Sequence, residues 1–111
     1  MKTVRVKTLE DNLKESVKAI RSQAKLKPKI AIILGSGLGE FAETISSPTI
    51  IDTHTIPHYP LSSVEGHKGR LIFGKIGNVA LLAFQGRVHF YETGNIETIL
   101  YPIRVAQALG I

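Results

Sequence analysis

The chain has 111 residues, of which 43% are hydrophobic, and a formal net charge of +5. This length predicts a single domain, residues 1–111, with enough apolar side chains for a buried core. The absence of cysteine excludes disulfides, a thiolate nucleophile and a cysteine-ligated zinc site. No apolar run is long enough to span a membrane and no signal peptide is recognisable, so we expect a cytoplasmic protein with no membrane partner.

The positive charge is concentrated in the first 30 residues, which hold nine Lys or Arg against three Asp or Glu. After Thr8, which can act as an N-cap with Asp11 three residues on, apolar residues recur at helical spacing. They are Leu9, Leu13, Val17, Ile20 and Ala24. Residues 1–28 are therefore predicted to form a basic amphipathic helix that ends at Pro28, with its lysines in solvent. No aromatic residue lies between the basic ones to stack on bases, so we expect no nucleic-acid partner.

A short apolar run followed by glycines comes next. Ile30–Leu34 has no polar residue, which is typical of a strand buried on both faces, as in a parallel sheet. Gly35-Ser36-Gly37 follows, and residues 38–43 can begin a helix. A strand, a glycine turn and a helix N-terminus together suit an anion such as phosphate. The dinucleotide fingerprint and the P-loop pattern are both absent, and a tight turn that binds nothing is the alternative.

The next stretch predicts a short helix and an exposed strand. Phe41, Ala42 and Ile45 favour a helix that is broken at Ser46-Ser47-Pro48, and Thr49–Ile56 is rich in Thr and Ile. His54 and His58 have the spacing of metal ligands on a helix. Pro57 lies between them and forbids the helix, so we expect no metal there.

A loop and a hairpin follow. Residues 61–69 have the composition of a loop, with His67 framed by two glycines. Arg70–Lys75 and Val79–Phe84 are β-rich runs joined across Ile76-Gly77-Asn78, which predicts a hairpin. A hairpin beside a buried parallel strand indicates an α/β fold with a mixed sheet flanked by helices.

Polar side chains alternate after the hairpin. If the strand continues past Phe84, Arg87, His89 and Tyr91 point to one side. A guanidinium, an imidazole and a phenol in a row suit a phosphate or phosphorylated ligand. The alternative is an edge strand whose polar face lies in water.

A last helix is predicted after Asn95, which can cap it. Its inward residues would be Ile99, Ile103 and Ala106. Pro102 either kinks this helix or marks its first turn.

Three motifs taken together, ILGSGLG, EGHKGRLIFG and QGRVHFYE, resemble the purine nucleoside phosphorylases of the trimeric type. The resemblance covers residues 29–111 and implies the half of a phosphorylase/hydrolase-like domain that holds phosphate and ribose. It implies phosphate-binding roles for Ser36, His67, Arg87, Val88 and His89. Tyr91 would contact the ribose, and Gly35, Gly37 and Glu92 would support the site. It implies no metal and no cofactor, because phosphate is a co-substrate.

The same resemblance leaves two alternatives. The first is a relative of the methylthioadenosine phosphorylases, which rank second because they usually have Thr where Ser36 stands and a different stretch after Arg87 and His89. Separately, Thr93-Gly94-Asn95 differs from the stretch that many purine nucleoside phosphorylases have after the motif. Family members are usually over twice this length, and the Glu and Asn that hold the purine would lie beyond Ile111. The fold would then be an incomplete N-terminal half, and a noncatalytic phosphate-binding or assembly module is the second alternative. We expect a purine nucleoside and inorganic phosphate as substrates, a homo-oligomer or a complementary C-terminal half as partner, and negligible activity from the isolated chain.

Overall fold

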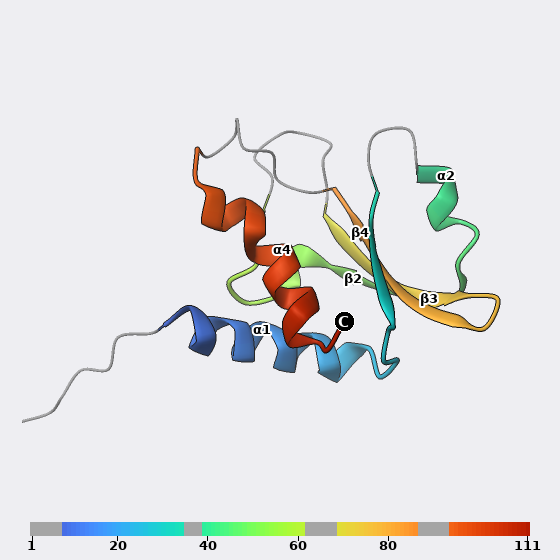
Figure 1. The fold of residues 1–111 in the computed structure, drawn as a ribbon, viewed down its shortest axis with the longest axis horizontal. Coiled ribbons are helices and arrows are strands. Elements are labelled where there is room, and N and C mark those ends of the chain that lie inside the picture. The colour runs from blue at the N-terminus through green and yellow to red at the C-terminus, as the bar shows by residue number, and fades with distance from the viewer. Residues whose placement is uncertain (1–7, 35–38, 62–68, 87–93) are drawn as a thin grey trace, which may run out of the picture.

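A computed structural model describes residues 8–34, 39–61, 69–86 and 94–111 (Figure 1). In chain order the elements are α1 (Leu9–Gln23), β1 (Ile30–Ile33), α2 (Gly39–Ala42), β2 (Ser46–Asp52), the 3-10 helix η1 (Thr53–Thr55), β3 (Arg70–Ile76), β4 (Val79–Gln85) and α4 (Ile96–Ala108). The strands form one sheet in the order β1-β4-β3-β2. β1 runs parallel to β4, and the other two pairs are antiparallel. The predicted mixed sheet of an α/β protein is thereby confirmed.

The hairpin strands divide their side chains between two cores, because alternate residues of a strand point to opposite faces. Figure 1 shows α1 and α4 together on one side of the sheet and α2 on the other. Leu71, Phe73, Leu82 and Phe84 join residues of α1 and α4 in the larger core. Ile72, Leu81 and Ala83 form the smaller core with residues around α2. The two hairpin strands are therefore covered on both faces, as their continuous apolar runs require.

The hairpin predicted at Gly77 is confirmed. β3 and β4 pair from Arg70 opposite Gln85 to Ile76 opposite Val79, which leaves a two-residue connection. Gly77 has a φ of 60°, a conformation that the first central position of a tight hairpin turn requires. The hairpin brings the end of β4 beside the start of β3.

The N-terminus of α1 is also as predicted. The Thr8 side chain accepts a hydrogen bond from the Asp11 backbone N–H, and the Asp11 carboxylate accepts one from the Thr8 N–H, which is a complete capping box. Ile20 and Ala24 are buried, and Lys14 and Lys18 are exposed.

The C-terminus and one face of α1 differ from the prediction. The helix ends at Gln23, because Ala24 already has an extended backbone, so Pro28 does not terminate it. Leu9, predicted to face inward, is exposed in the first turn of the helix. Ser16, which the apolar pattern did not select, is fully buried.

β1 is an edge strand among the described residues, and its predicted burial on both faces is wrong. It pairs with β4 alone, and Ile30 and Ile33 keep 44% and 39% of their surface exposed. An apolar run indicates that both faces of a strand are apolar. It does not indicate how many neighbours the strand has.

β2 begins and ends earlier than predicted. It spans Ser46–Asp52, and a register shift between Ser46 and Thr49 accommodates Pro48, which lacks an N–H to donate. The chain then turns into η1, where the Ile56 N–H donates to the Thr53 carbonyl. The strand is mostly exposed, as predicted.

α4 begins at the predicted cap, where the Asn95 side chain accepts from the Glu97 N–H. Its buried face is not the predicted one. Ala106 is buried, but Ile103 is 48% exposed, and the buried residues are Tyr101, Val105, Ala106 and, at the C-cap, Leu109. Pro102 lies inside the helix and not in its first turn.

Candidate functional site

The residues predicted to form or support a phosphate and ribose site lie outside the described residues. They are Gly35, Ser36, Gly37, His67, Arg87, Val88, His89, Tyr91 and Glu92. The structure shows where the three segments that carry them, residues 35–38, 62–68 and 87–93, join the fold.

All three segments join the fold at the same end of the sheet's strands (Figure 1). Residues 35–38 follow Leu34, after β1, and residues 87–93 follow Gly86, after β4. Because β1 and β4 are parallel, these ends lie side by side, and the Leu34 N–H donates to the Phe84 carbonyl at 2.9 Å. Residues 62–68 lead into Gly69, which precedes β3 at the same end of the strands, because Arg70 pairs with Gln85.

Gly69, the first described residue after the third segment, lies close to Thr53 and to Gly86 at the end of β4. A Cβ atom there would lie 2.5 Å from Thr53 Oγ1 and 3.2 Å from the Gly86 carbonyl oxygen. Only a glycine allows this close approach. The end of β4 therefore has the end of β1 on one side and Gly69, before β3, on the other.

A pocket of about 130 Å³ lies at this junction. Its apolar wall includes Ile33 and Phe84 from the strands and Ile99, Pro102 and Ile103 from α4. Mostly apolar walls with a few polar groups are typical of small-molecule sites.

The polar groups of the pocket come from Thr53, Tyr59, Gln85 and the backbone at Gly86. Thr53 is buried, and its N–H donates to the Gly69 carbonyl at 3.1 Å. Burial, reinforced by Tyr101, raises the pKa of Tyr59 well above its ordinary value, so the phenol stays neutral and can donate a hydrogen bond.

Sequence reasoning missed Thr53 and Tyr59. η1 and the turn after it carry both residues from the edge strand β2 to the ends of the central strands. Gln85 is the first residue of the QGRVHFYE motif, and its position directly before a glycine at a strand end is the signal that could have identified it as a site residue.

The described residues hold no group of three or more His, Asp or Glu side chains that could bind a metal ion. Nε2 of His58 lies 3.3 Å from a carboxylate oxygen of Glu15. Among the helices that the structure describes, none is long and apolar enough to cross a membrane.

The fold and the pocket define the class of protein. This is an α/β protein with a mixed sheet, in which a glycine-containing connection and two polar segments leave the sheet next to a small-molecule pocket. In open α/β sheets, ligands bind outside the carboxyl ends of the strands, where this pocket lies.

Comparisons with known proteins show which proteins this chain is similar to. No protein-family model matches the chain. Purine nucleoside phosphorylase 1 of Bacillus subtilis is 41% identical over 103 residues, which are 93% of this chain and 38% of that protein. The purine nucleoside phosphorylase of Rattus norvegicus is 39% identical over 92 residues, 83% of this chain and 32% of that protein.

Solved structures agree. The purine nucleoside phosphorylase of Schistosoma mansoni in complex with inosine superposes with a TM-score of 0.82 at 37% identity, covering 91% of this chain and 35% of that one. A purine nucleoside phosphorylase in complex with ribose-1-phosphate gives a TM-score of 0.84 at 38% identity, covering 91% and 37%. The sequence and the fold of the chain match the N-terminal part of purine nucleoside phosphorylases. It spans about a third of the length of the curated relatives it matches.

Proposed function

We propose that this chain is the part of a purine nucleoside phosphorylase that binds phosphate and ribose. One observation carries the proposal: the strand ends that lead to the GSG turn and to Arg87 lie side by side, Gly69, which follows the His67 segment, lies against Gly86, and Gly86 lines a pocket there. The relatives support it, because solved neighbours hold inosine and ribose-1-phosphate.

In the proposed reaction, an oxygen of inorganic phosphate attacks C1′ of a purine nucleoside. The bond from C1′ to the base nitrogen breaks, its electron pair leaves with the base, and the base takes up a proton. The products are the purine and ribose 1-phosphate. The sugar passes through an oxocarbenium-like state, as in glycoside hydrolysis, and an anion held beneath C1′ stabilises it.

The chain's own residues have stated roles in this proposal. Ser36, His67, Arg87, His89 and the Val88 backbone hold phosphate, with Arg87 contributing a bidentate charge-assisted contact. Tyr91 contacts the ribose, and Gly35, Gly37 and Glu92 support the site. The displacement needs no metal and no cofactor.

Loss of Arg87 tests the site. We expect Arg87→Ala to weaken phosphate binding by about 1.5–3 kcal/mol, the worth of a hydrogen bond to a charged group. Isothermal titration of the 111-residue chain with inorganic phosphate measures this. The matched control is Arg104→Ala, because Arg104 lies on α4 and is engaged by Glu97, with both nitrogen–oxygen contacts at 3.1 Å. Equal affinity in wild type and Arg87→Ala would refute the proposal.

A second candidate is a noncatalytic phosphate-binding or assembly module, favoured because the chain spans about a third of its relatives. Hypoxanthine release from inosine and phosphate distinguishes the two. We expect the 111-residue chain alone to turn over inosine negligibly, since nothing in it is assigned to stabilise the leaving purine. We propose that a second copy of the chain in a homo-oligomer, or a complementary C-terminal half, is the partner of this chain. Turnover at an ordinary phosphorylase rate by this chain alone would show that the base site is misplaced.

A further inference from the structure

A tight turn over Ile56-Pro57-His58-Tyr59 leads from η1 to the pocket. The Tyr59 N–H donates to the Ile56 carbonyl at 3.3 Å, and His58, the third residue, has a φ of 66°. Proline at the second position and positive φ at the third fit a type II turn, whose third residue is normally Gly or Asn. Histidine is strained in this conformation, so its surroundings must hold the turn closed.

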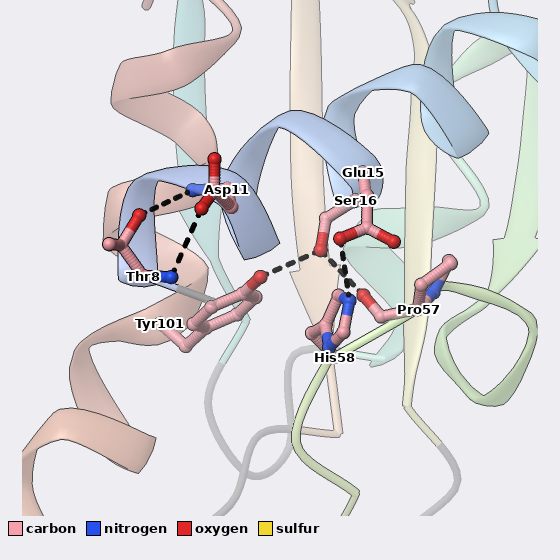
Figure 2. A network of polar contacts seen from close by, with 7 residues as sticks. All are labelled: Thr8, Asp11, Glu15, Ser16, Pro57, His58 and Tyr101. Atoms are coloured by element: carbon pink, nitrogen blue, oxygen red, sulfur yellow. Dashed lines mark hydrogen bonds and ion pairs between the residues drawn. The ribbon is translucent and has the colours of Figure 1, made fainter. Parts of the chain in front are cut away.

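Two consecutive residues of α1 contact this turn (Figure 2). The Ser16 hydroxyl donates to the Pro57 carbonyl at 2.5 Å, and Glu15 lies 3.3 Å from His58. Ser16 is fully buried, whereas 44% of the Glu15 side chain is accessible to water. The contact from Ser16 is therefore the one that water does not weaken.

The Ser16 hydroxyl is also 2.7 Å from the Tyr101 hydroxyl. A serine has one proton to donate, and a carbonyl can only accept. Since Ser16 donates to Pro57, Tyr101 must donate to Ser16. The two hydrogen bonds therefore run in one direction, from Tyr101 on α4 to Ser16 on α1 and from Ser16 to the Pro57 carbonyl of the turn.

Tyr101 also connects these hydrogen bonds to the pocket wall, because its ring packs on Tyr59. The ring of Tyr101 meets the ring of Tyr59 edge to face, with centroids 6.0 Å apart and planes at 88°. Tyr59 lines the pocket at the strand ends together with Gly86, the last described residue before Arg87. Ser16 therefore contacts both the backbone of the turn and the tyrosine that packs on Tyr59.

We propose that Ser16 is a positioning residue of the ligand site: through Pro57 and Tyr101 it holds the strained turn so that Tyr59 forms the pocket wall. The identity of the ligand rests on the proposed function. If Ser16 served only to join α1 to α4, its loss would weaken the whole fold and leave the turn no more open than the strands.

Amide hydrogen exchange and phosphate titration of the 111-residue chain separate these roles. In Ser16→Ala, we expect the Tyr59 amide to exchange at least tenfold faster while the β3 and β4 amides keep their protection. We expect phosphate affinity to fall at least fivefold. Ser22→Ala is the matched control, because the Ser22 hydroxyl donates only within its own helix, to the Ala19 carbonyl, and should change neither measurement.

A second substitution tests the role of strain. Glycine adopts a φ of 66° freely, so adding His58→Gly to Ser16→Ala should restore both Tyr59 protection and phosphate affinity. Unchanged Tyr59 exchange in Ser16→Ala, equal loss of protection in the strands, or an opened turn with unchanged phosphate affinity would each overturn the proposal. A wild-type chain that binds no phosphate would instead refute the proposed function, and the exchange data would still decide whether Ser16 holds the turn.

Discussion

The Tyr101 hydroxyl can donate its hydrogen bond to Ser16 only when the phenol is neutral. It donates to a buried serine that has already used its own proton, so an ionised phenolate would leave Ser16 without a donor. Burial, reinforced by Glu15, raises the pKa of Tyr101 above its ordinary value of 10.0. The folded chain therefore favours the protonated phenol more than the unfolded chain does.

This difference predicts alkaline instability. The stabilisation from the neutral phenols of Tyr101 and Tyr59 is complete below pH 10 and is lost as the pH rises through their raised pKa values. Urea unfolding at pH 8 and at successive pH values above 10 measures the loss.

Tyr101→Phe should lower the free energy of unfolding near pH 8 by about 0.5–1.5 kcal/mol, the worth of one hydrogen bond. It should also reduce the slope of stability against alkaline pH, because one titrating phenol is gone. Ser22→Ala, which loses a hydroxyl outside the network, should keep the wild-type slope. An identical slope in Tyr101→Phe would contradict the assignment of Tyr101 as donor.

At the scale of elements, α1 and α4 are joined by a second long-range contact. Nη2 of Arg21 donates to the Leu109 carbonyl, the C-cap of α4, at 2.9 Å. The last carbonyls of a helix lack partners within it, and a cation there also interacts favourably with the helix dipole. This contact fixes the C-terminus of one helix against the last turn of the other.

Removal of this contact should have a measurable but moderate effect. We expect Arg21→Ala to lower the free energy of unfolding by about 1 kcal/mol, since the guanidinium is partly in water and screened. The control is Lys18→Ala on the exposed face of α1, which should change stability by less than half as much. A fall in the urea midpoint that is equal in both variants would show that the Leu109 contact contributes nothing.

Local chemistry explains which elements could be predicted from the sequence. The caps at Thr8 and Asn95 and the turn at Gly77 depend on neighbouring residues only, and all three are confirmed. The buried face of α4 depends on distant partners. Tyr101 is buried because Ser16, far away in the sequence, provides its acceptor, while Ile103 borders the pocket and stays half exposed.

The candidate site divides in the same way. The ends of β1 and β4, which precede the glycine turn and Arg87, lie side by side because the two strands pair in parallel. The place of Thr53 and Tyr59 in the pocket could not be predicted, because a 3-10 helix and a strained β-turn bring these residues there from the edge strand β2. The positions of the phosphate-binding side chains remain a prediction.

For the molecule as a whole, the main feature is the outer edge of β1. Within the described residues, its unpaired side carries backbone N–H and C=O groups next to exposed Ile30 and Ile33. Such an edge accepts another strand readily, from a second copy or from a complementary chain.

We therefore expect the 111-residue chain to self-associate in solution, and we expect Ile33→Lys to weaken that association. The matched control is Ile50→Lys on β2, at the opposite edge of the sheet, because Ile50 is similarly exposed at 50%. Light scattering over a concentration series reports the outcome. A monodisperse wild-type particle of 12.1 kDa at high concentration, or association abolished only by Ile50→Lys, would contradict this use of the β1 edge.

The parallel pairing of β1 with β4 also has a consequence for synthesis of the chain. Ile33 pairs with Phe84, about 50 residues later, so a ribosome adding about 5–20 residues per second makes β1 roughly 3–10 s before its partner exists. The hairpin of β3 and β4 can close as soon as it emerges, because its two strands are adjacent in sequence. β1 can join the sheet only afterwards. Until then an apolar strand waits unpaired, and this interval is when the nascent chain most needs protection from aggregation.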